Sequence, residues 1–419
     1  MTKATFPSTL SGTRGIAWLG LLAILAAPAA GGCQCSRRPS GEHGPGSAGS
    51  ANPAKCEGAR ATAAAVRSLR APAPVQQLAV AAGPSGSMLL AVAKSLVHAG
   101  PGSGRALQHI GTGEGGKDVE QDPAVTASGK EFAAVWRRRR GDADYLVFAR
   151  LRPDGSLEGS ERAEPLFGAR PGVAIASSGT GLAVALATEG AVGVRLLAAD
   201  GKPLGAPLLL PGSGGGTSPA IAFQAPGFVA AWTSPGSSVA VDGSASPGTI
   251  TTARIDPASR EVRQLAALVS HSPTARAALA SAGERILMAW SDRDAGEGPW
   301  AVYTAAFDRN GVRLAQPERQ PGLAIDAAPA LASGASFASV AWTEPGGGGR
   351  TKSFWARLGD AGERSGEPLA VQGGEVVGPA PVAAALAWDG AAFVLVRPGA
   401  QPTDVDLYRF GPFGCDARP

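Results

Sequence analysis

The sequence predicts an all-β fold, a β-propeller of seven four-stranded blades, preceded by a signal peptide and a flexible tether. Gly and Pro contribute 59 and 34 of the 419 residues, so turns must be frequent. Apolar residues make up 44%, enough for a large core, and they occur in short runs rather than in long helical periods. A unit of about fifty residues recurs, and four short strands per unit are typical of a propeller blade.

Charge and residue usage narrow the classes of function. Lys and Arg total 38 against 34 Asp and Glu, a balance of +4 that gives no reason to expect a nucleic-acid partner. Four His, four Cys and three Tyr are few for a chain of this length. The sequence therefore predicts no metal site and no cofactor.

The first 32 residues have the pattern of a signal peptide. Lys3 and Arg14 supply sparse positive charge, and residues 15–27 form an apolar stretch. That stretch is shorter than the ~20 residues of a membrane-spanning helix. We therefore expect it to direct export rather than to span the bilayer.

The segment from Ala30 to Cys33, with the sequence AGGC, resembles a bacterial lipobox. The resemblance implies lipid modification of Cys33, and Gln34 after it implies retention at the outer membrane of a Gram-negative cell. Ala30 departs from the pattern, because lipoboxes usually carry Leu there. The alternative is ordinary cleavage after Ala29, which would give a periplasmic or secreted protein. Residues 33–71, rich in Ser, Gly and Pro, are expected to form the flexible tether.

Residues 72–419 carry the repeat and are expected to form the propeller. Each clear unit opens with a proline, continues through a strand, a Gly turn and a second strand, and then through a third strand and a further turn. The opening prolines are Pro123, Pro171, Pro219, Pro273, Pro329 and Pro381. A degenerate unit with strands at 75–82 and 88–93 precedes these six and makes seven blades. A six-bladed ring with an unrelated N-terminal hairpin is the alternative.

The last unit ends after its third strand, near Phe410, so closure of the ring needs a fourth strand from elsewhere. We expect the stretch from Arg67 to Gln77 to supply it. Cys56 would then lie close to Cys415, and in an oxidising compartment the two are expected to form a disulfide.

The units resemble a repeat of exported bacterial β-propeller proteins, many of them lipoproteins. The repeat reads P-x-V-A-x-x-G-x-x-F-x-V-x-W, followed by A-R and a Gly turn, and residues 123–155 and 329–362 are the closest copies. The resemblance implies a fold and a compartment, and it implies no established activity.

Arginines are the main candidates for binding. Arg137, Arg138, Arg139 and Arg140 are expected to extend a loop after Trp136, where they could attract acidic partners, although a solvated loop is the more common explanation of such a run. Equivalent positions of the third strands carry Arg150, Arg195, Arg254, Arg357 and Arg409. Packing of their side chains between blades is the more common, structural explanation of these residues. The recurring Trp136, Trp232, Trp290 and Trp342 are expected to fill the space between sheets.

Catalysis and calcium binding have weaker support. The stretch from Ser291 to Trp300 resembles the start of a calcium loop, but an acidic ligand at the regular spacing is missing, so an exposed turn is favoured. None of His98, His109 and His271 lies in a recognisable motif. Carboxylates for glycoside hydrolysis could be drawn from Asp144, Asp292, Asp294 or Glu344, but spacing cannot show that they converge.

We therefore expect a monomeric, non-catalytic envelope lipoprotein whose propeller binds or scaffolds an envelope protein or an acidic polysaccharide. A hydrolase or lyase that acts on an extracellular polysaccharide is the alternative. Perturbed carboxylates at the mouth of the channel would favour the enzyme, whereas a funnel lined by Ala, Gly and Arg would favour binding.

Overall fold

The fold was analysed in a computed structural model that describes residues 67–93, 95–100, 108–110, 118–235, 247–294, 298–334, 337–346, 350–371, 376–377 and 382–411. Every regular element in these ranges is a β-strand. No helix among them has the length and hydropathy of a membrane span.

The strands form seven antiparallel sheets, which we number as blades in chain order. Blade 1 contains β2 (Gln77–Gly83), β3 (Gly86–Ala93), β4 (Ser95–Ala99) and β5 (Gln108–His109). Blade 2 contains β6 (Val119–Ser128), β7 (Glu131–Arg140), β8 (Ala143–Leu151) and β9 (Arg162–Leu166). Blade 3 contains β10 (Ala169–Ser177), β11 (Gly181–Thr188), β12 (Val192–Ala198) and β13 (Leu208–Leu209). Blade 4 contains β14 (Thr217–Gln224), β15 (Gly227–Ser234), β16 (Gly248–Ile255) and β17 (Val262–Ser270).

The remaining three blades follow the same order. Blade 5 contains β18 (Arg276–Ala282), β19 (Arg285–Arg293), β20 (Trp300–Phe307) and β21 (Glu318–Arg319). Blade 6 contains β22 (Ala330–Ser333), β23 (Ala338–Pro345), β24 (Arg350–Leu358) and β25 (Leu369–Ala370), with β26 (Val376–Val377) also paired to β24. Blade 7 contains β27 (Ala385–Trp388), β28 (Phe393–Pro398), β29 (Asp404–Phe410) and β1 (Arg67–Arg70).

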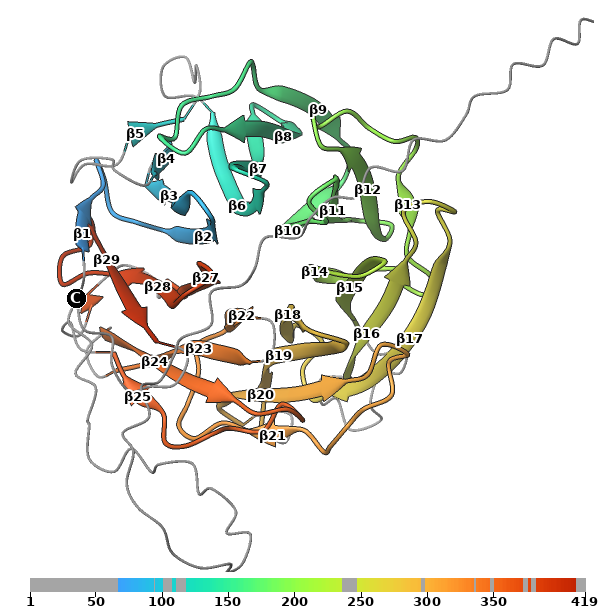
Figure 1. Cartoon of the computed structure of the whole chain (residues 1–419), viewed down its shortest axis with the longest axis vertical. Coiled ribbons are helices and arrows are strands. Elements are labelled where there is room, and N and C mark those ends of the chain that lie inside the picture. Colours follow the sequence, from blue (N-terminus) through green and yellow to red (C-terminus); the bar gives the residue numbers. More distant parts are fainter. Residues whose placement is uncertain are drawn as a thin grey trace, which may run out of the picture. The chain divides into compact units, whose positions relative to one another are not determined.

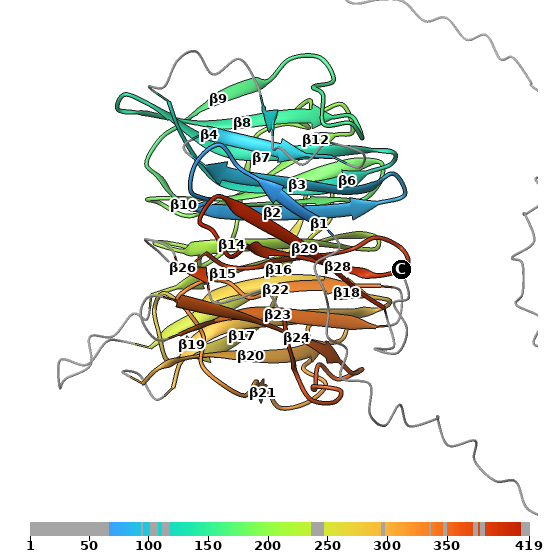
Figure 2. The same cartoon turned by 90° about the vertical axis from the view of Figure 1, so that its left-hand side faces the viewer.

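The sheets are arranged in a ring, as Figure 1 shows, and Figure 2 shows the ring from its side. The first strand of each blade is innermost, and it contacts the first strand of the next blade all the way round, including β27 against β2. The predicted seven-bladed propeller is confirmed, and the six-bladed alternative is wrong because β2 to β5 form a complete blade of the ring.

The ring closes through its N-terminal strand. β1 pairs with β29 as the outer strand of blade 7, with Arg67 opposite Leu407 and Arg70 opposite Asp404. The prediction that the stretch from Arg67 to Gln77 completes the last blade is confirmed for Arg67–Arg70, whereas Gln77 already begins β2 of blade 1. The predicted end of the tether at residue 71 is wrong, because residues 67–70 already belong to the sheet.

Three of the opening prolines lie inside innermost strands, where the register is interrupted. Pro123, Pro171 and Pro219 each fall at a register shift against the second strand of their blade. Because proline cannot donate a hydrogen bond to a neighbouring strand, a bulge is one of the few places in a sheet where it fits. In blades 2, 3 and 4 the recurring proline therefore occupies a bulge of the innermost strand.

The core lies between neighbouring blades. The four recurring tryptophans are at most 4% exposed, and each belongs to a cluster that joins two blades. Trp136, for example, packs in one cluster with Met88 and Leu90 of blade 1. The prediction that these side chains fill the space between sheets is confirmed.

Turns after the third strands dock onto the preceding blade. Gly201 has φ +81°, and a Cβ atom there would lie 2.1 Å from Cε1 of Phe148 in blade 2. Only glycine both adopts this left-handed backbone conformation readily and leaves room for the close approach of the Phe148 ring. The turn glycines Gly155, Gly311 and Gly362 make equivalent close approaches to the blade before them.

Candidate functional site

The ring has two faces. The loops between second and third strands and the links between blades lie on one face, which we call the upper face. The turns between first and second strands and between third and fourth strands lie on the other, the lower face.

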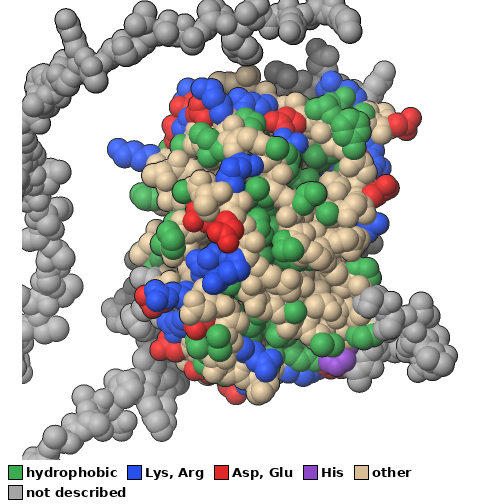
Figure 3. All heavy atoms as spheres, turned by 90° about the vertical axis from the view of Figure 1, so that its right-hand side faces the viewer, with side chains coloured by type: hydrophobic (Ala, Val, Ile, Leu, Met, Phe, Trp, Pro, Cys, Tyr) green, Lys and Arg blue, Asp and Glu red, His purple; other side chains and the backbone are tan. Residues whose placement is uncertain are grey.

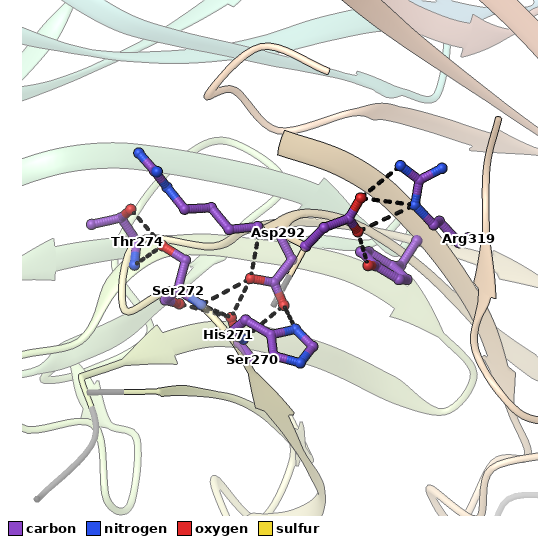
Figure 4. Close-up of polar contacts among 9 residues, drawn as sticks. Ser270, His271, Ser272, Thr274, Asp292 and Arg319 are labelled. Atoms are coloured by element: carbon purple, nitrogen blue, oxygen red, sulfur yellow. Dashed lines mark hydrogen bonds and ion pairs between the residues drawn. The ribbon is translucent and has the colours of Figure 1, made fainter. Parts of the chain in front are cut away.

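A polar cluster of the upper face holds the link between blades 4 and 5, and Figure 4 shows it in close-up. Asp292 is 2% exposed and stands at the end of β19. Its Oδ1 accepts hydrogen bonds from the Ser270 hydroxyl (3.0 Å) and the Ser272 backbone N–H (2.9 Å), and Oδ2 accepts one from the His271 backbone N–H (2.9 Å). Such a buried, fully bonded carboxylate fixes the backbone that carries the chain into the next blade.

Asp294 forms a second, more exposed part of this cluster. Its carboxylate accepts a hydrogen bond from the Tyr303 hydroxyl and pairs with the Arg319 guanidinium at 2.7 Å. The hydrogen bond from Arg319 holds the pKa of Asp294 below its usual range. Burial, followed by the bond to Asp294, raises the pKa of Tyr303 to about 12. At neutral pH the trio is therefore a charged pair with a neutral phenol.

The cluster also contains a histidine beside an acid, an arrangement that can serve nucleophilic catalysis. His271 Nδ1 lies 3.5 Å from Asp292 Oδ2, and its side chain is 54% exposed. The neighbouring Ser270 is fully buried, and its single hydroxyl proton is shared between Asp292 Oδ1 and the Ser272 carbonyl, at 3.0 and 2.7 Å. Because a buried hydroxyl cannot reach a substrate, this serine fits a structural role and not that of a nucleophile.

The other predicted carboxylates lie on different blades. Asp144 is the second residue of β8 in blade 2 and pairs with Arg139 at 3.2 Å. Glu344 lies near the end of β23 in blade 6 and accepts a hydrogen bond from Trp342 Nε1 at 3.1 Å. Burial raises the pKa of Glu344. The four candidates are thus distributed over three blades, and within the described ranges no three His, Cys, Asp or Glu side chains gather as metal ligands.

The expectation of a basic loop at Arg137–Arg140 is wrong, because the four residues end strand β7. Arg137 and Arg138 are 5% and 8% exposed. The acidic partners of the run come mainly from the neighbouring strand β6 and its approach. Arg137 pairs with Asp122, Arg138 with Glu120 and Glu161, Arg139 with Asp144 and Arg140 with Asp118. The charges are therefore compensated inside blade 2.

The third-strand arginines lie toward the lower face, and three of them have carboxylate partners. Arg150 pairs with Glu131 and Glu158, Arg195 with Glu164, and Arg409 with Asp389. Arg357 holds the equivalent position in β24. These contacts support the structural explanation for Arg150, Arg195 and Arg409.

Arg254 in blade 4 differs from these. Its guanidinium donates to oxygens that carry no charge, the Gln224 side chain and the Arg309 backbone carbonyl. Arg263 lies opposite it in the β16–β17 register. Desolvation, followed by the nearby Arg263 and Arg309, lowers the pKa of Arg254. The three residues form a cation cluster, which we call the blade 4 arginine cluster.

The sequence analysis missed two members of this cluster, Arg263 and Arg309. They lie on a fourth strand and on a turn of the next blade, so they share no repeat position with Arg254.

Several predicted residues lie outside the described residues. These are Cys33, Cys56 and Cys415, the signal peptide, and residues 295–297 of the calcium-like loop. Of that loop, Asp292 and Asp294 are described, and both accept hydrogen bonds from protein donors.

Comparisons with known proteins return the architecture alone. No protein-family model matches the chain, and no curated protein matches it significantly. Among solved structures, the phage phi92 endosialidase is 10% identical with a TM-score of 0.46, covering 82% of this chain and 69% of that chain. The Dos1 propeller is 10% identical with a TM-score of 0.45, and the match covers 83% of this chain and 95% of that chain. Raptor from Chaetomium thermophilum is 10% identical with a TM-score of 0.48, and the match covers 82% of this chain and 28% of that chain.

Proposed function

We propose that this protein is a non-catalytic cell-envelope lipoprotein whose propeller binds or scaffolds another envelope component, a protein or an acidic polysaccharide. The observation that carries the proposal is the blade 4 arginine cluster. Arg254 is surrounded by neutral acceptors and by two further cations, whereas its counterparts Arg150, Arg195 and Arg409 have carboxylates. Arg309 pairs with the exposed Glu284 at 3.9 Å, and among the described residues no ion pair joins Arg254 or Arg263 to a carboxylate. A group of cations with so little compensating charge favours an anionic partner.

A binding role fits the state of the candidate catalytic groups. Asp292 is occupied by hydrogen-bond donors and Asp294 by a cation. General acid catalysis of glycoside hydrolysis needs a carboxyl with a raised pKa beside a second carboxylate. The pKa of Asp294 is lowered instead, which favours a structural salt bridge. Burial raises the pKa of Glu344, but this residue stands on blade 6 apart from the other three candidates and accepts a hydrogen bond from Trp342.

The proposed location is the outer membrane, with the chain held by a lipid on Cys33 and the propeller acting as a monomer. The lipobox-like sequence before Cys33 supports the anchor. A periplasmic or secreted protein follows if the chain is cleaved after Ala29. Closure of the ring within one chain supports a monomer, since no second copy is needed to complete a blade.

Co-purification tests the proposal. The tagged full chain is cross-linked in intact cells, and the recovered envelope proteins and polysaccharides are quantified for wild type and for the double variant Arg263→Gln, Arg309→Gln. We expect recovery to fall in the double variant. Arg276→Gln, which changes an exposed arginine paired with Asp326, is the matched control and should behave as wild type. Equal recovery from wild type and an untagged strain would contradict the binding role.

A further inference from the structure

Blade 4 ends in an unusually long outer strand. β17 has nine residues, whereas the outer strands of the other blades have two to five. β17 is the last strand of its sheet and pairs with β16 on one side. Along the other side of such an edge, backbone N–H and C=O groups are available to another strand. Figure 3 faces this side of the ring.

The strand carries few of the features that protect an edge from pairing. Its sequence, VRQLAALVS, contains no proline and one charged residue, Arg263. One bulge interrupts the register between Gln264 and Ala267, and there the Thr252 hydroxyl bonds the backbone of Ala266. Short length, proline and several charges are the usual protection of edge strands. β17 therefore has the length and composition to accept a further strand.

The two ends of β17 differ in chemistry. At the upper end Val269 is 79% exposed, and Ala267 on the same side of the strand is also exposed. At the lower end Arg263, a member of the blade 4 arginine cluster, is exposed and stands opposite Arg254. An incoming strand would meet an apolar surface at one end and cations at the other.

We propose that β17 is a docking edge for an extended segment of an envelope protein, which adds to blade 4 as an antiparallel fifth strand. This inference rests on the proposed binding function and specifies the partner as a protein. Antiparallel pairing continues the pattern of the sheet and places the start of the segment at Val269 and its end at Arg263. Strand residues pair one to one apart from the bulge, so residues of the partner segment that face Val269 and Arg263 are about six positions apart. The partner segment should therefore carry β-branched apolar residues at its start and Asp or Glu about six residues later.

A peptide of defined sequence tests the docking edge. The probe is acetyl-Thr-Val-Thr-Val-Thr-Val-Thr-Asp-Glu-amide, and its reversed sequence is the control for direction. We expect the probe to bind the full chain, to bind more tightly than its reverse, and to slow amide hydrogen exchange in β17. No binding at millimolar probe, or slowed exchange confined to other strands, would overturn the proposal.

Surface variants separate the two ends of the edge. Val269→Lys and Arg263→Glu should each weaken binding of the probe at least tenfold, whereas Arg263→Lys should retain it. Leu209→Lys changes an exposed apolar residue on the two-residue outer strand of blade 3 and should bind as wild type. Equal weakening by Leu209→Lys would contradict a specific edge.

The same variants distinguish failure of this inference from failure of the proposed function. If Arg263→Glu lowers retention on an acidic polysaccharide while Val269→Lys leaves envelope recovery unchanged, the partner is a polysaccharide and strand addition is wrong. If wild type recovers envelope proteins and both variants recover them equally, the binding function stands and the docking edge is wrong. Loss of the same protein from both variants, with wild-type melting temperatures, supports the docking edge.

Discussion

Ser68 donates a hydrogen bond from its hydroxyl to Asp406 Oδ1 at 2.6 Å, although 338 residues separate the two. The contact lies inside the β1–β29 pairing, where the two residues stand opposite each other. It joins the first described strand to the last one and so closes the ring. Asp406 is 8% exposed, which makes the bond resistant to competition from water.

Loss of this closure should expose the edge of blade 7. We expect Ser68→Ala to lower the free energy of unfolding by about 1–3 kcal/mol, the usual cost of losing a hydrogen bond to a charged group. Deletion of residues 56–70 removes β1 and should cause aggregation, because β29 then presents unpaired backbone groups. Deletion of residues 36–50 is the control and should leave folding unchanged. Denaturant unfolding and light scattering measure these outcomes, and a monomeric, fully stable 56–70 deletion would contradict the role of β1.

The turn glycines offer a test of how blades are held together. Gly179 and Gly201 have similar φ, +85° and +81°, but a Cβ atom would meet open space at Gly179 and the Phe148 ring at Gly201. Gly179→Ala should therefore cost about 1–2 kcal/mol for the left-handed conformation alone. Gly201→Ala should cost about 1–3 kcal/mol more because the contact between blades 2 and 3 is overfilled. Urea unfolding of the two variants measures the difference, and equal stabilities would show that Phe148 moves aside freely.

The architecture could be predicted because its determinants are local. The proline, the Gly turn and the buried Trp recur within each unit, so Trp136 and Gly155 already mark strands and turns in the sequence. Closure could be predicted because blade 7 lacks a strand after Phe410. The ion pairs could not be predicted from the sequence. The partner of Arg138 is Glu120, which lies on a strand whose register includes an unforeseen bulge. Nor does the sequence set β17 apart, because fourth strands are weakly marked throughout.

The arginine run in β7 should contribute to stability rather than to recognition. Arg138 is buried with Glu120 and Glu161, and removal of one partner from such a group typically costs about 3–5 kcal/mol. We expect Arg138→Ser to lower the melting temperature clearly. Arg140→Ser, with a side chain that is 62% exposed, should have a small effect, since exposed ion pairs contribute little. Calorimetry on both variants decides between a role in stability and a role in recognition. An unchanged melting temperature for Arg138→Ser would contradict the role in stability and favour binding by Arg137–Arg140.

The lipid anchor can be tested independently of the propeller. If Cys33 is acylated, growth with a fatty-acid analogue should label the wild type, and Cys33→Ser should be unlabelled and leave the membrane fraction. Cys35→Ser is the matched control and should be labelled as wild type is. An unlabelled wild type whose mature chain begins at Ala30 would instead establish ordinary cleavage after Ala29.

Acid should weaken the contact between Asp294 and Arg319. Because the pKa of Asp294 is lower in the folded chain than in the unfolded chain, its contribution to stability is present above the unfolded pKa and is lost as pH falls through the folded pKa. Asp294→Asn should remove that part of the acid dependence. It should also lower the pKa of Tyr303 from about 12, since the bond and the charge of Asp294 both raise it. Ultraviolet titration of the tyrosines, with Tyr303→Phe to assign the signal, measures this shift, and an unchanged Tyr303 pKa in Asp294→Asn would show that burial alone is responsible.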